Sequence, residues 1–413
     1  MKVGFVYEEI YNWHRSGDLH CGQPLVEPLE SWENEGTKRR FANLLAVTGL
    51  IKKLEHIQAR QTTKEEILRF HTEEYHDRVE SGSSSPLGAS VGEEAIFGFG
   101  AYEIAAMSAG GVIAAVEAIM EEQIKRAYCL VRPPGHHAER DTGMGFCLFN
   151  NVVLAAMHLR EKYGAVKKIA IVDYDVHHGN GTQQAFFDDK DVFFISLHQD
   201  NNYPQGNSGS IEERGSESAK DEQGYYTTIN VPLPPGSGRG VYRYVFKELV
   251  LPAVSRFQPD FILVSNGFDA EYCDCLAAMM LSSDDYHHFA SELCSLSDSL
   301  PNCKGICFVH EGGYSKDYVP FCGTAVIEAL LGTEPAKRVV DPYLAEVQQW
   351  GYQDMQLHQK LIVDRARVLH GFMSKEEYIS AQFQAIVVDT FLNLPGADPK
   401  ALREKLATVT ENN

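Results

Sequence analysis

The chain of 413 residues is 44% hydrophobic and 23% charged, the composition of a globular protein with enough apolar side chains for a sizeable core. Its net charge of −20 argues against a protein that follows a nucleic-acid backbone, which needs a basic surface. The amino terminus reads as a strand rather than a secretory leader, and no apolar run is expected to cross a membrane. The nine cysteines show no C-x-x-C zinc pattern, so we expect reduced thiols in the cytoplasm.

From residue 1 to about residue 333, short apolar runs alternate with longer amphipathic segments. This alternation predicts strand–helix–strand units and a parallel sheet. The run 101–119 is apolar on nearly all sides, as in a helix that is buried against a sheet. The expected strands are 1–7, 127–131, 168–175, 192–198, 227–233, 261–265 and 306–309, and the expected helices are 38–54, 101–119, 150–162, 241–257 and 284–300.

Residues 334–413 differ from the rest, because helix-like segments follow one another there without an evident strand. Ser374-Lys-Glu-Glu377 has the pattern of a capping box, as does Thr63-Lys-Glu-Glu66 earlier in the chain. Thr37 is expected to begin the helix 38–54. We therefore expect a helical carboxyl-terminal extension over 334–413 that packs on the preceding domain or joins subunits.

Polar side chains occur where four of the expected strands end, and the carboxyl ends of parallel strands gather at one edge of a sheet. Asp175 and His177 are two residues apart on an extended segment, so they point to the same side and can hold one metal ion together. Taken alone, this pair also fits a hydrogen-bonded Asp beside a surface histidine. The four polar endings are His136-His137, Asp175 with His177, Asp269 and Tyr314, and together they predict a shared site.

Six motifs occur in chain order: Arg132-Pro-Pro-Gly-His-His-Ala138, Gly145-Phe-Cys-Leu-Phe-Asn-Asn151, Asp173-Tyr-Asp-Val-His-His-Gly-Asn-Gly-Thr182, Ser196-Leu-His198, Gly267-Phe-Asp-Ala270 and His310-Glu-Gly-Gly-Tyr314. Together they resemble the signature of the zinc-dependent histone deacetylase family. The similarity runs from the first strand to about residue 333, and it is greatest to the class II branch and its bacterial deacetylase-like amidohydrolases. The resemblance implies an arginase-like three-layer α/β fold, with one eight-stranded parallel sheet flanked by helices in a deacetylase domain over 1–333.

The resemblance implies two cation sites. A catalytic zinc has three protein ligands and leaves a position for water, which it makes acidic enough to attack an amide. The family's zinc ligands match Asp175, His177 and Asp269. A structural monovalent cation, expected to be K⁺, matches oxygen atoms of residues that include Asp173, Ser196 and Leu197.

The resemblance also assigns roles in acid–base chemistry. His137 matches the general base, which later acts as general acid, and His136 matches a mainly electrostatic partner. Asp173 matches the residue that orients His136, and Asn180 the residue that orients His137. An Asn leaves its histidine less basic than a carboxylate would. Tyr314 matches the donor to the oxyanion of the tetrahedral intermediate, and its presence argues for a competent enzyme.

The expected substrate is an acyl-lysine side chain of a protein or peptide. Phe146 and Tyr203 match the aromatic walls of the family's narrow tunnel, and Gly145 matches a carbonyl that accepts from the substrate amide. Leu276 stands where polyamine-selective relatives carry a Glu near the tunnel mouth, so a neutral residue there favours acyl-lysine.

Three other functions compete with this expectation. An acetylpolyamine amidohydrolase stays open, because other polyamine-selective relatives use acidic residues from different loops. A binuclear manganese hydrolase of the arginase type is disfavoured, because His136-His137 and a lone Asp269 stand where bridging carboxylates are needed. A non-enzymatic reader of acyl-lysine would require loss of the catalytic groups, which are all present. The preferred acyl group and the oligomeric state, including a homo-oligomer, are left open.

Four residues near the expected site have undecided roles. Glu93 and Glu94 lie in the loop where many relatives carry an Asp that grips the substrate backbone, and solvated charges fit equally well. Cys273-Asp-Cys275 replaces a more usual Asp-Pro after Asp269. We favour a plain loop there over a redox-sensitive one.

Overall fold

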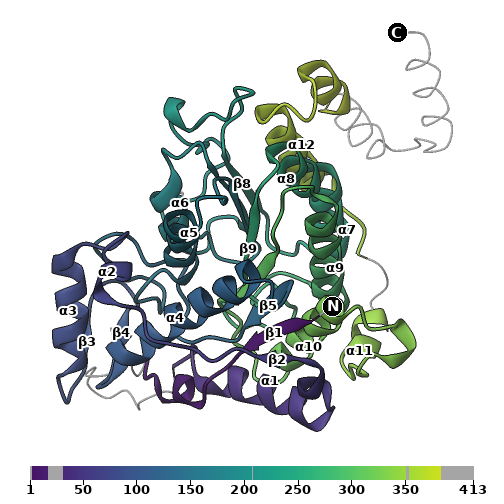
Figure 1. Ribbon diagram of the computed structural model, residues 1–413. Coiled ribbons are helices and arrows are strands. Elements are labelled where there is room, and N and C mark those ends of the chain that lie inside the picture. Colours follow the sequence, from purple (N-terminus) through teal and green to yellow (C-terminus); the bar gives the residue numbers. More distant parts are fainter. Residues whose placement is uncertain (1, 17–30, 207, 350–352, 383–413) are drawn as a thin grey trace, which may run out of the picture.

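The computed structural model of the protein describes residues 2–16, 31–206, 208–349 and 353–382. An eight-stranded sheet in the order β2-β1-β5-β10-β9-β6-β7-β8 lies at its centre, with helices on both faces (Figure 1). Every neighbouring pair in this sheet is parallel, which confirms the predicted α/β architecture. The strands are β1 (Val3–Val6), β2 (Glu55–His56), β5 (Arg126–Cys129), β6 (Ile169–Asp173), β7 (Val192–Gln199), β8 (Thr228–Leu233), β9 (Phe261–Asn266) and β10 (Ile306–His310), and β3 (Ala89–Ser90) pairs separately with β4 (Ile96–Phe97).

Two apolar cores lie on opposite faces of the sheet. Ala170 and Val172 of β6 belong to one core, and Ile169 and Ile171 belong to the other. Successive side chains of a strand point to opposite faces, so a strand covered on both sides needs a continuous apolar run. The helices are α1 (Glu35–Val47), α2 (Lys64–Ile67), α3 (Glu73–Ser83), α4 (Ala101–Met120), α5 (Asn151–Lys162), α6 (Asn180–Phe186), α7 (Arg239–Val245), α8 (Leu251–Phe257), α9 (Ser283–Ser299), α10 (Val319–Leu331), α11 (Leu344–Gln349) and α12 (Leu357–Leu369).

Helix α4 packs in the core formed on one face of the sheet, against α5 and β5. It is long and apolar enough, by length and composition alone, to cross a membrane. The expectation that no apolar run has this length is therefore wrong. However, 72% of its most apolar window is buried inside the protein, and burial on all sides explains its composition.

The first long helix begins and ends differently from the prediction. Asn34 rather than Thr37 caps α1, since its side-chain oxygen accepts from the Gly36 backbone N–H at 2.9 Å. Gly49 then adopts a left-handed φ of 77° and ends the helix, and a 3₁₀ turn over Leu50–Lys53 follows. The capping box at Thr63 is present, with both of its reciprocal hydrogen bonds.

Some elements were missed by the sequence reasoning. The edge strand β2 has two residues, too few for a periodic pattern, and α3 is absent from the expected helices. The expected helix 241–257 is α7 and α8 joined by a π-helical turn over Phe246–Val250.

The described part of the carboxyl-terminal extension is helical. Val363 and Ala366 of α12 are buried in one of the two cores, and α12 contacts β8 and α7. Ser374 and Glu377 exchange the two hydrogen bonds of a capping box, at 2.8 and 3.1 Å, before a helical segment over 375–382. Residues 383–413 lie outside the described residues.

Candidate active site

Four adjacent strands at the centre of the sheet carry the predicted polar endings. The order β5-β10-β9-β6 places the loops after these strands side by side at one edge. These loops bear, in that order, His136-His137, Tyr314, Asp269 and Asp175 with His177. The fold therefore brings these side chains together, as expected, because neighbouring parallel strands end at the same edge of the sheet.

Asp175, His177 and Asp269 form a fully buried cluster whose ligand atoms lie within 4.8 Å of one another. The Nδ1 atom of His177 is 3.1 Å from Asp175 Oδ1 and 3.1 Å from Asp269 Oδ2. The other carboxylate oxygens accept backbone N–H groups at 2.8 Å, Asp175 from Gly312 and Asp269 from Val176. Each carboxylate is thus held with one oxygen toward the cluster. Two carboxylates and one imidazole fit the donor set of a catalytic zinc.

Two glycines make room for these carboxylates. A Cβ atom on Gly267 would lie 2.0 Å from Asp175 Oδ2, and a Cβ atom on Gly312 would lie 2.0 Å from Asp269 Oδ2. Any larger residue would displace the carboxylates, so the backbone approaches the cluster at positions that only glycine can occupy.

His136 and His137 lie beside the cluster with ring centroids 4.0 Å apart. His136 Nδ1 is 3.0 Å from Asp173 Oδ2, and His137 Nδ1 is 2.8 Å from Asn180 Oδ1. Burial alone would lower the pKa of His136, but the carboxylates of Asp175 and Asp173 raise it to about 10. Burial, with the positive charge at His136, holds the pKa of His137 well below its usual value. The neighbouring carboxylates therefore favour the charged form of His136, and burial favours the neutral form of His137.

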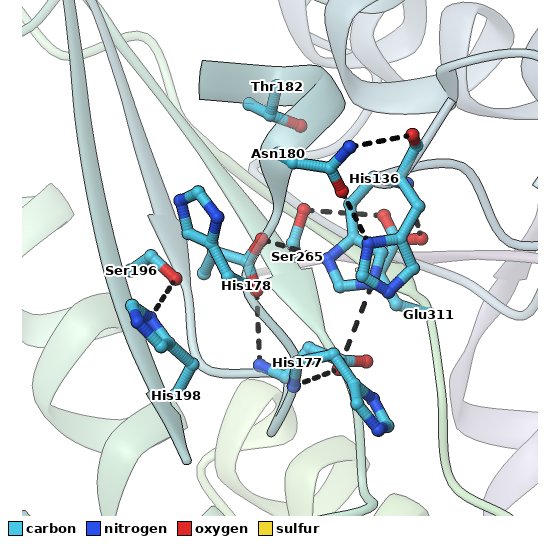
Figure 2. A network of polar contacts seen from close by, with 12 residues as sticks. His136, His177, His178, Asn180, Thr182, Ser196, His198, Ser265 and Glu311 are labelled. Atoms are coloured by element: carbon cyan, nitrogen blue, oxygen red, sulfur yellow. Dashed lines mark hydrogen bonds and ion pairs between the residues drawn. The ribbon is translucent and has the colours of Figure 1, made fainter. Parts of the chain in front are cut away.

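Glu311 supports the backbone that leads into these histidines (Figure 2). Its Oε2 atom accepts the N–H groups of Gly135 at 2.7 Å and of His136 at 3.2 Å. The Ser265 hydroxyl donates to Oε1 at 3.3 Å. Burial raises the pKa of Glu311 to about 7. Glu311 belongs to the motif His310–Tyr314, but the sequence assigned it no role. The available signal was a charged residue directly after a buried strand.

A pocket of about 400 Å³ opens onto the cluster and the neutral histidine. The Tyr203 ring lies 5.0 Å from His137 and the Phe146 ring 5.8 Å from Tyr314, so aromatic side chains form its walls as predicted. The pocket is also lined by Trp32, Asn202 and Gln205. The sequence did not point to these three residues, because they lie in segments that are read only as loops. The full lining is Trp32, Glu93, Glu94, His137, Gly145, Phe146, His177, Asn202, Tyr203, Gln205, Leu276 and Tyr314.

Glu93 and Glu94 hold the Phe146 wall through their backbone. The carbonyl of Glu93 accepts the Gly145 N–H at 3.0 Å, and that of Glu94 accepts the Phe146 N–H at 2.9 Å. Phe146 has a left-handed φ of 68°, which is unfavourable for a bulky residue and persists where its surroundings determine it. Both glutamates also line the pocket, so the structure places these undecided residues beside the candidate site.

The residues assigned to a monovalent cation lie where β6 meets β7. Asp173 and Ser196 are partners in the parallel pairing, and Leu197 follows on β7. The Ser196 hydroxyl is 2.9 Å from His198 Nδ1, and the His198 ring lies 4.9 Å from that of His178 (Figure 2). His178, which had no assigned role, thereby joins a buried polar network. The cation itself stays a prediction.

Comparisons with known proteins agree with this geometry. A family described as the histone deacetylase domain matches residues 32–330. A histone deacetylase-like amidohydrolase of Pseudomonas aeruginosa is 40% identical over 347 residues, covering 82% of this chain and 88% of that protein. A probable deacetylase of Archaeoglobus fulgidus is 33% identical over 352 residues, covering 84% of this chain and 91% of that protein.

A solved structure extends the similarity to the fold. The crystal structure of the HDA15 HD domain superposes with a TM-score of 0.75 at 28% identity, covering 94% of this chain and 99% of that one. The matched region contains the central strands and all of the site loops. The chain is a hydrolase of the amidohydrolase type and belongs to the histone deacetylase family.

Proposed function

We propose that the protein is a zinc-dependent amidohydrolase that removes acetyl or another acyl group from lysine side chains. One observation carries the proposal: His137, with Nδ1 facing Asn180, lies beside a buried three-ligand cluster, and Tyr314 lines the same aromatic-walled pocket. A pocket with aromatic walls fits an acylated side chain, and the backbone of the substrate would then stay outside. The site then meets the acyl group with a base and a hydrogen-bond donor.

Asp175, His177 and Asp269 would hold the zinc ion. When bound, zinc supplies a Lewis acid for the acyl carbonyl and lowers the pKa of a water molecule. The three residues are oriented by backbone N–H groups or by one another before any ion binds. Such preorganisation is what a metal site requires of its supporting contacts.

The histidines and Tyr314 perform the proton chemistry. His137 presents Nδ1 to Asn180, so its Nε2 atom is left to accept a proton from the attacking water and to return it to the leaving amine. His136, held charged by Asp173, stabilises the negative charge that develops on the acyl oxygen. The Tyr314 hydroxyl donates to that same oxygen.

A monovalent cation, most simply K⁺, would stabilise the strand ends below the site through oxygen atoms of Asp173, Ser196 and Leu197. Two observations support this site. Asp173 pairs with Ser196 across the two strands, and the carboxylate of Asp173, which faces His136, is fully buried. The melting temperature in K⁺ is expected to exceed that in tetramethylammonium, and Ser196→Ala should reduce the difference. Equal melting temperatures in both salts would contradict this site.

The substrate class is the most specific part of the proposal. Leu276 is neutral at the pocket opening, which favours an acyl-lysine peptide. Glu93 and Glu94 line the same opening, and two carboxylates attract a cationic chain. An acetylpolyamine is therefore the second candidate substrate.

Zinc-loaded protein should be assayed with an acetyl-lysine peptide and with acetylspermidine. We expect a higher kcat/KM for the peptide, and a strong preference for acetylspermidine would overturn the lysine assignment. A double variant that carries both Glu93→Gln and Glu94→Gln removes the two negative charges. It keeps both backbone carbonyls that hold Gly145 and Phe146. If the glutamates select polyamines, this variant loses activity on acetylspermidine much more than on a neutral peptide. Two manganese ions per chain instead of zinc would contradict the metal assignment.

A further inference from the structure

The loop between β9 and α9 carries a half-buried carboxylate, Asp274, between the exposed thiols of Cys273 and Cys275. Asp274 Oδ2 accepts the backbone N–H of Tyr314 at 2.8 Å. Its Oδ1 atom accepts the backbone N–H of Leu276 at 2.8 Å. One carboxylate therefore joins two residues that line the pocket from different loops.

Tyr314 follows directly after a glycine in a conformation that other residues rarely adopt. Gly313 has a φ of 119°, a region that L side chains rarely adopt. The Tyr314 ring extends between Phe146, at a centroid distance of 5.8 Å, and His177, at 6.3 Å. Its hydroxyl position depends on where the backbone is held. A charged acceptor fixes that N–H more strongly than a neutral one would.

Leu276 is connected to the opposite wall as well. Its carbonyl accepts the side-chain amide of Asn202 at 3.1 Å, and Asn202 precedes Tyr203, the aromatic ring beside His137. Hydrogen bonds thus run from the Tyr203 wall through Leu276 and Asp274 to Tyr314. This chain of contacts joins three residues that line the pocket, Asn202, Leu276 and Tyr314.

We propose that Asp274 is a positioning residue that holds the Tyr314 hydroxyl and the Leu276 side chain at fixed places relative to each other. The proposal rests on the proposed function, in which Tyr314 donates to the acyl oxygen. Asp274 touches no reacting atom and acts through the backbone of Tyr314. Its loss displaces the donor without removing it.

Asp274→Asn tests this directly. The amide has one acceptor oxygen and one NH₂ group, so it can satisfy only one of the two N–H groups that the carboxylate accepts. We expect kcat on an acetyl-lysine peptide to fall about 10- to 100-fold, as for a displaced catalytic group, with KM and zinc content little changed. Cys275→Ser is the matched control in the same loop and should retain wild-type kcat.

A double-mutant cycle separates positioning from a general structural effect. In the Tyr314→Phe background the hydroxyl is already absent, so adding Asp274→Asn should reduce kcat by less than about threefold. An equal loss in both backgrounds would show that Asp274 does not act through Tyr314 and would overturn the proposal. Unchanged kcat in the single variant would also overturn it.

Amide hydrogen exchange of the segment 311–318 gives a second readout that does not depend on turnover. The Tyr314 N–H should exchange faster in Asp274→Asn than in the wild type or in Cys275→Ser, and equal exchange would overturn the proposal. If the wild type hydrolyses no acyl-lysine substrate, the proposed function fails, while the exchange comparison still decides whether Asp274 holds Tyr314. If Asp274→Asn does not fold, Asp274→Ser, which likewise removes one of the two acceptor oxygens and the charge, replaces it under the same criteria.

Discussion

The side-chain oxygen of Asn180 lies 2.8 Å from Nδ1 of His137. The orientation of the amide is determined by its other end, because Asn180 Nδ2 donates to Glu139 Oε1 at 2.8 Å. An amide oxygen can only accept, so His137 Nδ1 carries the hydrogen and Nε2 is the proton acceptor. A neutral acceptor at this position also leaves the imidazole without a compensating negative charge.

Replacing Asn180 with Asp is expected to raise the pKa of His137, because a carboxylate stabilises the imidazolium. A general base works in its neutral form, so a higher pKa moves the acidic limb of the pH profile of kcat/KM upward, by about 1 pH unit. Activity is then lost at the acidic end and kept at the alkaline end. An acidic limb that does not move would contradict the assignment of His137 as the base.

Replacing Tyr314 with Phe is expected to reduce kcat about 100- to 1000-fold, because the oxyanion loses one donor. KM and zinc content should change little, since the ring and its contacts with Phe146 remain. Steady-state kinetics with metal analysis measure both. Tyr226→Phe removes a surface hydroxyl that contacts Glu217 and serves as the control. Near-full activity of the Tyr314 variant would refute its role.

Removal of the metal is expected to abolish activity and to lower stability. Burial and the charge of Asp175 raise the pKa of Asp269, which shows that the two carboxylates repel without a cation. Zinc at about 100 times its Kd adds roughly 2.7 kcal/mol to the free energy of unfolding, seen as a higher Tm.

The metal prediction has a matched control within the chain. Asp269→Asn should lose bound zinc. Asp77→Asn alters a second His–Asp–Glu cluster, in which Asp77 is 3.0 Å from Lys64 Nζ and is therefore already paired. That variant should bind zinc like the wild type, and equal zinc content in both variants would contradict the assigned ligands.

Acid is expected to destabilise the fold in part through His71. This imidazole is buried and accepts the backbone N–H of Asn150 at 3.0 Å, and burial lowers its pKa to about 3. The unfolded chain protonates His71 near pH 6.5, so its contribution is complete above that pH and is lost as the pH falls toward 3. From pH 6.5 to pH 5 the loss is about 1.6 kcal/mol.

Urea unfolding at several pH values measures this effect. His71→Gln keeps an acceptor for Asn150 but cannot titrate, so its stability should depend less on pH between 6.5 and 5 than that of the wild type. His358 is exposed, and His358→Gln is the control that should keep the wild-type slope. Parallel curves for His71→Gln and the wild type would contradict the prediction.

The sequence by itself determined the class of fold and the composition of the site. Apolar runs of strand length alternate with helical segments, and this local periodicity depends only on neighbouring residues. The polar residues at the strand ends predicted Asp175, His177 and Asp269 as one cluster, and the parallel sheet brings them together.

Only the tertiary structure decided which strands are neighbours and which contacts support the site. The order β5-β10-β9-β6 follows from covering both faces of the sheet with helices, and no local pattern contains it. Glu311 and Asp274 act by accepting backbone N–H groups from distant loops. A backbone N–H is present at almost every residue, so the sequence does not distinguish the one that such a carboxylate will meet. Which N–H group a carboxylate meets depends on the distances between loops, and these distances are set only when both cores are packed.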